Sequence, residues 1–266
     1  MNIGKTIRLN RLFAHPSKRF CSVAVDHFLM YGLGLPSGLN HMKQTLAEIA
    51  KASPDAVTMH KGIAKHLWFD YAGKIPLIVN STFLHPDSLI SQQTVTAEEA
   101  IRLGADAIAI VIYVSGPGEV EYLRTVTDLV REANLFELPV ICHIYPRKIT
   151  EKGLEISFKP EDIAWAAHCA GEVGVDIIKV PYCGDVSAYR DIVSNAPVPV
   201  VAAGGPQQTT LEAALDMMAQ VVQSGANGAT IGRNIWGQKN ITTTVQAFKA
   251  VIHDGLSAKE AIKLTQ

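Results

Sequence analysis

The chain has 266 residues and a formal net charge of −1; 48% of its residues are hydrophobic and 18% are charged. A chain of this length and composition can bury a large core without disulfides or metal ions as staples. Because no basic stripe or lysine run is present and the apolar runs are only strand-length, we expect neither nucleic acid nor a membrane as a partner.

The N-terminal segment from Met1 to Phe13 is charged and has no long apolar stretch, so we expect no cleaved secretory signal. The cysteines form no CxxC pair and lie beside small or apolar residues. This pattern is typical of buried thiols in a reducing compartment and predicts a cytoplasmic protein, with a catalytic or acyl-carrying cysteine as the alternative. The four cysteines are Cys21, Cys142, Cys169 and Cys183.

Short runs rich in valine and isoleucine alternate with longer segments of helical periodicity along the whole chain. Runs that are apolar nearly throughout are typical of parallel strands covered on both sides. In chain order, the predicted strands are Ser22–Asp26, Ala56–Met59, Leu77–Asn80, Ala107–Val114, Val140–Tyr145, Ile177–Pro181, Val200–Ala203 and Gly228–Ile231.

The segments between these runs carry helix start and stop signals. Capping-box spacing predicts helix starts at Thr96 with Glu99, Thr209 with Glu212, and Ser257 with Glu260, and Pro160 suits a first turn. Glycine just before a strand predicts helix ends at Gly104, Gly174 and Gly225.

This strand–helix rhythm, repeated about eight times in about 250 residues, predicts a single (β/α)8 TIM barrel that forms one catalytic domain over residues 1–266. An open doubly wound sheet is the alternative, but it would normally carry GxGxxG after the first strand, where this chain has none.

In such a barrel the active site lies at the carboxyl ends of the strands, where Lys179 is the most informative residue. It interrupts the apolar run from Val175 to Pro181. A buried ammonium is expensive, so the usual outcome is a lowered pKa and a free amine that can condense with a ketone or aldehyde. The alternative is a structural lysine whose head reaches the rim.

Glycine-containing turns follow the last two predicted strands, where barrels often bind phosphate. Gly204 and Gly205 follow the seventh strand, and Gly232 with Arg233 follows the eighth. Glycine lets the backbone approach phosphate oxygens, and a guanidinium adds a charge-assisted contact. Tight turns with no ligand are the alternative.

Two further strand-end residues are candidates for proton transfer. The Tyr145 phenol is a weak acid that could relay a proton near a charged amine, unless it is an amphipathic core tyrosine. Asp26 could pair with Lys179 or move protons, unless it only caps a turn at the rim.

The same residues give the chain a resemblance to the archaeal-type class I fructose-bisphosphate aldolases of the DeoC/FbaB/LsrF aldolase group. The resemblance is carried by Val25-Asp26-His27, Tyr145-Pro146-Arg147, the run from Asp176 to Pro181 around Lys179, Gly204-Gly205 and Gly232-Arg233. It extends in order over nearly the whole chain.

The resemblance implies a lyase of carbohydrate metabolism that cleaves or forms a C–C bond in a phosphorylated ketose or sugar. Lys179 would form the Schiff base, Tyr145 would be the general acid and base, and Asp26 would orient the lysine or transfer protons. The substrate and its phosphate would be bound by His27, Arg147, Gly204, Gly205, Gly232 and Arg233. No metal or organic cofactor is implied. Relatives are homo-oligomers, commonly decamers.

The chain departs from the family pattern at Lys148, where glycine is expected, and at Ala203 and Gln207, where serine and lysine are usual. These positions touch phosphates or the far end of the substrate, so the pattern predicts the chemistry and not the sugar. A transaldolase-like aminodideoxyheptulosonate synthase and an LsrF-like acyl-transferring enzyme would use the same lysine.

Two other classes of function remain open from the sequence. A metal-dependent barrel epimerase or aldolase would need His27, His60 and His143 to converge on zinc, although no HxH pair is present. A non-catalytic binding barrel is the other possibility, although Lys179, Tyr145 and Asp26 are all retained.

Overall fold

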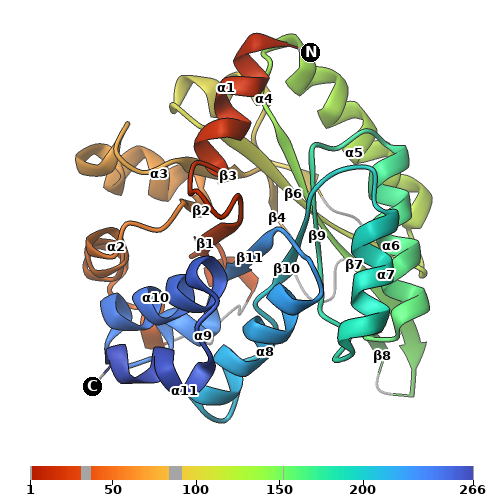
Figure 1. Cartoon of the computed structure of the whole chain (residues 1–266). Coiled ribbons are helices and arrows are strands. Elements are labelled where there is room, and N and C mark those ends of the chain that lie inside the picture. Colours follow the sequence, from red (N-terminus) through yellow and green to blue (C-terminus); the bar gives the residue numbers. More distant parts are fainter. Residues whose placement is uncertain (1, 31–36, 84–91, 152, 266) are drawn as a thin grey trace.

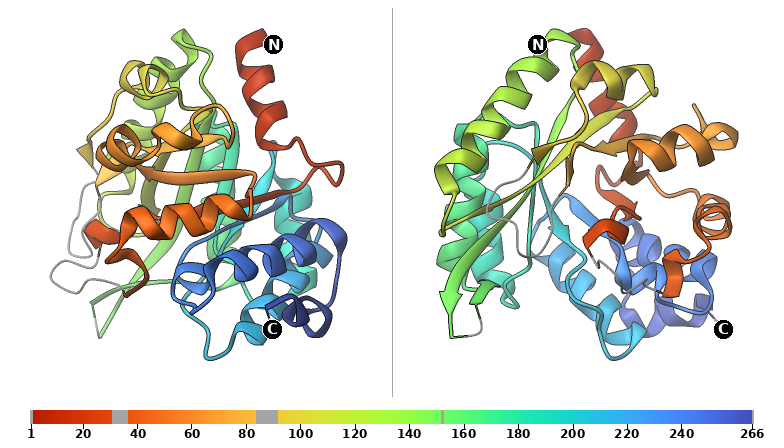
Figure 2. Two further views of the ribbon diagram at one scale, coloured as in Figure 1. Left: turned by 90° about the vertical axis from the view of Figure 1, so that its left-hand side faces the viewer. Right: turned by 180° about the vertical axis from the view of Figure 1, so that it is seen from behind.

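The structure is a computed structural model that describes residues 2–30, 37–83, 92–151 and 153–265. Eight parallel strands close into a barrel, with helices on their outer side (Figures 1 and 2). Around the barrel the strands are β1 (Phe20–Ala24), β2 (Ala56–His60), β3 (Leu77–Asn80), β6 (Ala107–Val114), β7 (Val140–Thr150), β9 (Ile177–Val180), β10 (Val200–Ala203) and β11 (Gly228–Ile231). The predicted (β/α)8 barrel is confirmed.

The barrel closes where β11 pairs with β1, because Phe20 lies in register with Gly228 and Val23 with Ile231. β7 is longer than predicted: it leaves the barrel and pairs antiparallel with β8 (Gly153–Ile156), which forms a hairpin. β1 begins and ends two residues before the predicted strand, so Asp26 follows β1 instead of ending it. A short ribbon of β4 (Thr82–Phe83) and β5 (Gln92–Gln93) lies beyond β3.

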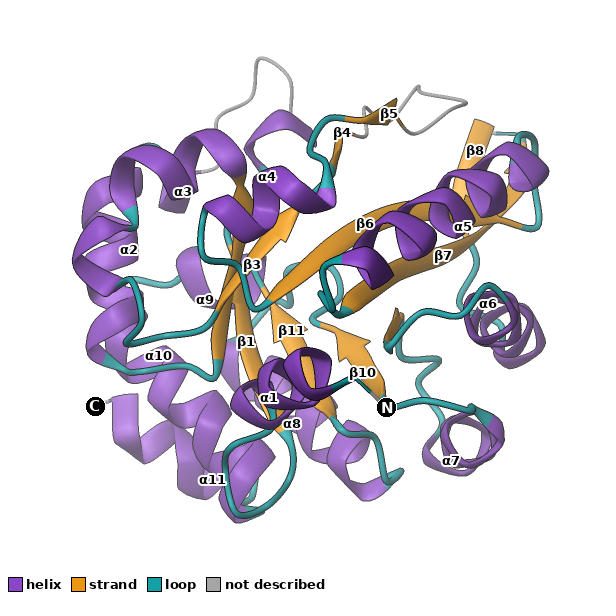
Figure 3. Cartoon of the chain, turned by 90° about the horizontal axis from the view of Figure 1, so that it is seen from above, coloured by secondary structure: helices purple, strands orange, loops and turns teal. Residues whose placement is uncertain are grey.

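The helices mostly surround the strands, as Figure 3 shows from above. The α-helices are α1 (Ile3–Leu12), α2 (Met42–Lys51), α3 (Lys61–Leu67), α4 (Ala97–Arg102), α5 (Glu119–Leu135), α6 (Pro160–Glu172), α7 (Val186–Asn195), α8 (Leu211–Gln223), α9 (Arg233–Trp236), α10 (Ile241–Lys249) and α11 (Ala258–Ala261). 3-10 turns occupy Phe28–Met30, Ser37–Leu39, Phe69–Tyr71 and Ile262–Thr265, and Ala250–Asp254 is π-helical.

The capping signals are mostly confirmed. Thr96 and Ser257 form capping boxes, and Pro160 opens α6. The prediction at Thr209 is wrong by one residue, because Thr210 is the N-cap of α8 and its hydroxyl accepts from the Ala213 N–H. Gly104, Gly174 and Gly225 have positive φ, as expected of glycines that end helices.

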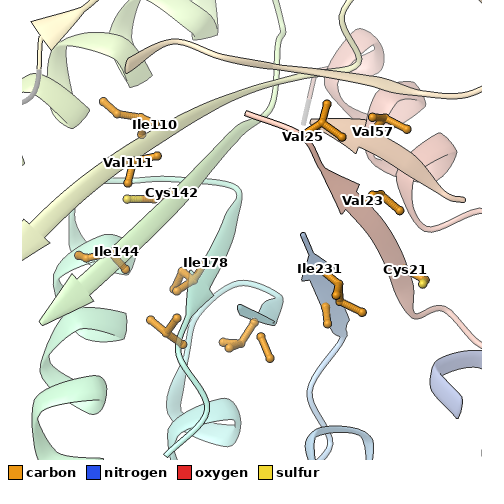
Figure 4. Close-up of a cluster of buried hydrophobic side chains, with 14 of the residues drawn as sticks. Cys21, Val23, Val25, Val57, Ile110, Val111, Cys142, Ile144, Ile178 and Ile231 are labelled. Carbon is orange, nitrogen blue, oxygen red and sulfur yellow. The ribbon is translucent and has the colours of Figure 1, made fainter. Parts of the chain in front are cut away.

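Two apolar cores are separated by the alternation of side chains along each strand. The outer core lies between strands and helices and includes Val23, Val57, Ile110 and Ile178 (Figure 4). The inner core fills the barrel and is made of Leu12, Phe20, Ala56, Ile78, Ala107, Ala109, Ile141, Ile177 and Val201.

Helix α1 covers the amino-terminal end of the barrel. It is held there by ion pairs from Lys5 to Asp176 and from Arg11 to Asp106. Asp176 directly precedes β9, and Asp106 directly precedes β6. Its last residue, Leu12, is fully buried in the inner core. The barrel is therefore closed at this end, and its polar side chains gather at the other.

We predict that Leu12→Ala lowers the free energy of unfolding by about 2–5 kcal/mol, because it leaves a cavity in the inner core. The matched control is Ile7→Ala on the same helix, where the side chain is 54% exposed and the effect should stay within about 0.5 kcal/mol. Urea denaturation followed by circular dichroism measures both. Equal losses of stability in the two variants would show that Leu12 does not close the inner core.

Candidate active site

The alternation that builds the inner core also selects the polar residues that face the barrel interior. Ile141 and Ile177 belong to the inner core, and two positions further along the same strands are His143 and Lys179. Because side chains two apart share a face of a strand, these two residues point inward as well. Asn80 follows Ile78 in the same way on β3. The carboxyl end of the barrel is therefore polar inside.

Lys179 lies on β9 between Ile178 and Val180, which both pack in the outer core. Its side chain is only 5% exposed and lines the central cavity. Burial lowers the pKa of its amine to about 8, with Asp26 acting in the opposite direction and Arg233 in the same one. Among the described residues, none forms an ion pair or hydrogen bond with the amine. At neutral pH an appreciable fraction is thus an unprotonated nucleophile.

Asp26 is held behind the cavity by a polar network. The Asn80 side-chain amide donates a 2.6 Å hydrogen bond to the Asp26 carboxylate, and His60 Nε2 lies 3.0 Å from the Asp26 carbonyl oxygen. Burial alone would raise the pKa of this carboxyl, but His27 and other neighbours, Lys179 among them, bring it to about 2. Asp26 is therefore a fixed negative charge that acts on Lys179 without direct contact.

The imidazoles near this charge are kept neutral by burial. The pKa of His27 falls to about 4 in spite of Asp26, whose carboxylate lies 3.3 Å from Nδ1. The pKa of His143 is well below its ordinary value, because burial and then Lys179 oppose its protonation. His143 lies in register with Lys179 on the neighbouring strand. Any contact of these rings with a substrate would thus be made by neutral imidazole.

Tyr145 lies two residues beyond His143 on β7 and lines the same cavity as Lys179. Burial, followed by Tyr113 and Asp26, raises the pKa of its phenol well above the ordinary value. The phenol therefore keeps its proton at neutral pH and can donate it. Once it has donated, the phenolate is a strong base.

The glycine turns bring two loops close together. A Cβ on Gly204 would lie 2.9 Å from Ile231 Cα, and one on Gly232 would lie 2.7 Å from His27 Cε1. The Gly204 N–H is already donated to the Thr230 carbonyl at 2.9 Å. Gly204 thus contributes close approach to the site and not a backbone donor.

Side chains from the last turn fix the loop that carries Gly204 and Gly205. The Asn234 amide donates to the Gly204 carbonyl at 2.8 Å and to the Pro206 carbonyl at 3.1 Å. Arg233 donates to the Gly205 carbonyl at 3.0 Å. Gly205 adopts a φ of +69°, which favours glycine. The Arg233 guanidinium is thereby held at the cavity wall beside these glycines.

Arg147 lines the cavity but is built into its wall. Its guanidinium carbon lies 3.9 Å from the centre of the Tyr113 ring, and it donates to the Pro117 carbonyl at 3.3 Å. These contacts fix the start of the β7–β8 hairpin against the barrel.

The central cavity has a volume of about 540 Å³ and is lined by every predicted site residue except Asp26, which lies next to the lining residue His27. No role was predicted for Asn80, Tyr113 or Asn234. The apolar residues of the hairpin were also missed, because β8 was not predicted. The lining residues beyond the prediction are Tyr113, Leu154, Glu155, Ile156, Phe158, Pro181, Ala203, Pro206 and Thr230.

The three histidines considered as zinc ligands do not form a metal centre in the part of the chain that the structure describes. No group of three or more histidine, cysteine or acidic side chains is placed there to hold a metal ion. His60 instead makes its hydrogen bond to the Asp26 backbone.

Comparison with known proteins identifies related enzymes. A model of the DeoC/LacD family aldolases matches residues 20–238. The 2-amino-3,7-dideoxy-D-threo-hept-6-ulosonate synthase of Halobacterium salinarum is 30% identical over 97% of this chain and 95% of its own length. The class 1 fructose-bisphosphate aldolase of Thermoproteus tenax is 29% identical over 97% and 98%.

A solved structure has the same fold over nearly the whole chain. It is an archaeal fructose-1,6-bisphosphate aldolase whose catalytic lysine is covalently bound to the carbinolamine intermediate of its substrate. It superposes with a TM-score of 0.82 at 28% identity, covering 94% of this chain and 99% of that one. The match to the family model spans most of the chain, and this protein therefore belongs to the DeoC/LacD family of aldolases.

Proposed function

We propose that this protein is a class I aldolase, similar to fructose-bisphosphate aldolase, that cleaves or forms a C–C bond in a phosphorylated ketose through a Schiff base on Lys179. The observation that carries the proposal is a buried amine with a pKa of about 8 that faces a cavity at the carboxyl end of the barrel. Its relatives with Schiff-base chemistry support the same reading.

In the cleavage direction, the neutral Lys179 amine attacks the substrate ketone and gives a carbinolamine, which loses water to become an iminium. Tyr145 supplies the proton that the departing hydroxyl needs, and its phenolate then takes the proton of the substrate hydroxyl as the C–C bond breaks. The electron pair of that bond moves into the iminium and gives an enamine. Protonation of the enamine carbon and hydrolysis release the second product and the free amine.

The substrate phosphate is assigned to the wall formed by Gly205, Gly232 and Arg233. Arg233 supplies a fixed positive charge, and the glycines allow the backbone close to the oxygens. Gly204 supports this wall through its packing, His27 offers a neutral ring, and Arg147 also lines the cavity. Asp26 tunes Lys179 by its charge.

A transaldolase-like aminodideoxyheptulosonate synthase is the second candidate, favoured by the 30% identity to the Halobacterium enzyme. It would use the same lysine and differ in the acceptor, as would an LsrF-like acyl-transferring enzyme. Product analysis with and without each acceptor separates the three.

The remaining proposals concern the whole molecule. We assign residues 1–266 to one catalytic domain, supported by the pairing of the first strand with the last. All four cysteines are free, which supports a cytoplasmic location. No helix of the described residues is long and apolar enough to cross a membrane. A homo-oligomer, such as the decamers of the family, is proposed from resemblance alone.

Borohydride with dihydroxyacetone phosphate should add one covalent adduct to the wild-type protein, because reduction makes the iminium permanent. Lys179→Met should take up none while remaining folded, since methionine has nearly the same volume. Intact-mass spectrometry and circular dichroism provide the two readouts. An adduct of equal yield on both proteins would place the nucleophile at another lysine.

The rate of adduct formation should rise with pH with its midpoint near pH 8, because the ammonium form cannot attack the ketone. Asp26 holds the pKa of Lys179 up, so Asp26→Asn should move the midpoint to lower pH. Quenched-flow trapping across pH 6–10 measures both curves. A midpoint that Asp26→Asn raises would contradict the proposed electrostatics.

Arg233→Ala should raise KM for a phosphorylated ketose by about 10-fold to 100-fold, the range expected for a charge-assisted contact. The dephosphorylated ketose should change little. Because Arg233 also lowers the pKa of Lys179, both substrates are assayed on each protein at the same pH, so that a change in protonation of the amine affects both alike. Equal effects on the two substrates would remove the phosphate assignment.

A further inference from the structure

The β7–β8 hairpin forms an apolar wall on the cavity, made by Leu154, Ile156 and Phe158. In the antiparallel pairing, Ile156 lies opposite Arg147 and Leu154 lies opposite Ile149. Residues directly opposite each other share a face of a hairpin, so Ile156 lies on the face that Arg147 presents to the cavity. Phe158, just beyond β8, extends the wall and is 44% exposed.

The lysine of the hairpin, Lys148, is turned away from the face that Arg147 and Ile156 share. Lys148 lies opposite Glu155 in the pairing, one position out of phase with Arg147 and Ile156. The Lys148 amine forms a 2.7 Å ion pair with Asp162 of α6. Glu155 does line the cavity, and its carboxylate accepts a 2.9 Å hydrogen bond from the Thr150 hydroxyl; its negative charge also opposes a phosphate there. The hairpin therefore offers no cation to the cavity within the described residues.

Among the described residues, the cavity has one cation that is suited to binding a phosphate. Of its basic side chains, Lys179 is the reacting amine, and Arg147 is stacked on Tyr113. Arg233 remains, beside Gly205. Segments 31–36 and 84–91, outside the described residues, contain no lysine or arginine in their sequences. Lys152 also lies outside the described residues.

A phosphate dianion and an alkyl group would bind to this wall with very different affinities. Moving a dianion from water to an apolar surface without a cation is unfavourable. Each methylene that leaves water there should instead gain about threefold to fourfold in affinity. The hairpin wall thus selects against charge at the end of the substrate remote from Arg233.

We infer that the substrate is a ketose monophosphate whose half remote from the phosphate ends in an uncharged, apolar group, because the cavity joins one guanidinium to an apolar hairpin wall. This inference rests on the proposed Schiff-base function. In synthesis, the enamine carbon bonds to the carbon of an apolar aldehyde, and the aldehyde oxygen takes a proton from Tyr145. Water then releases the ketose from Lys179.

The test uses dihydroxyacetone phosphate as donor with either butanal or glyceraldehyde 3-phosphate as acceptor. We expect kcat/KM to be at least tenfold higher for butanal, and to rise from ethanal through propanal to butanal. Borohydride trapping of the donor, which involves no acceptor, reports separately on the proposed function. No adduct would refute that function; an adduct with preference for the phosphorylated aldehyde, or with no butanal turnover, would overturn the inference alone.

A pair of hairpin variants locates the selectivity. Ile156→Lys places a cation on the wall and should raise kcat/KM for glyceraldehyde 3-phosphate relative to butanal by tenfold or more. Ile149→Lys is the matched control: Ile149 shares the hairpin face of Leu154, but it is 74% exposed and lies outside the cavity lining, so its lysine would be in solvent. The ratio should stay near the wild-type value there. Equal ratios in the two variants would exclude the hairpin wall as the source of selectivity.

Discussion

The buried amine of Lys179 is the constraint on which the rest of this architecture depends. A lysine head in a barrel interior is tolerated only if its charge is weakened or balanced. Here burial lowers the pKa of the amine, and the negative charge of Asp26 partly offsets this effect. The inner core, which includes Leu12, fills the barrel on the amino-terminal side of Lys179 and excludes water from that side. The amine is therefore reactive because the fold makes its protonated form costly.

The charges around this amine suit a site where Lys179 would be neutral in one step of the proposed reaction and cationic in another. Asp26 is ionised, whereas His27 and His143 are neutral because they are buried. Arg233 opposes a positive charge on Lys179 in the free enzyme. A phosphate bound to Arg233 would offset that opposition and favour the cationic iminium. In the proposed mechanism, phosphate binding and covalent chemistry would thus support each other electrostatically.

The barrel was predictable because local patterns and the global fold agree. Val200–Ala203 and Gly228–Ile231 are apolar runs bounded by glycine turns, and both were predicted with the observed bounds. The polar strand ends could be found for the same reason. The β7–β8 hairpin could not, since its residues from Lys148 to Ile156 read as a mixed loop. Its structure comes from pairing beyond the barrel, and so does the apolar wall. Asn80 and Asn234 gain meaning only from partners far along the chain.

The seam between β1 and β11 joins the first strand of the barrel to the last one in chain order. Asp26 follows one side of this seam, and Arg233 follows the other. A nascent chain on the ribosome can form βα units one after another, but it cannot close the ring until the final strand emerges. A chain that stops before that strand has an open sheet with two exposed edges, which are prone to aggregate. Completion of the proposed catalytic centre and protection from aggregation thus both await the synthesis of β11.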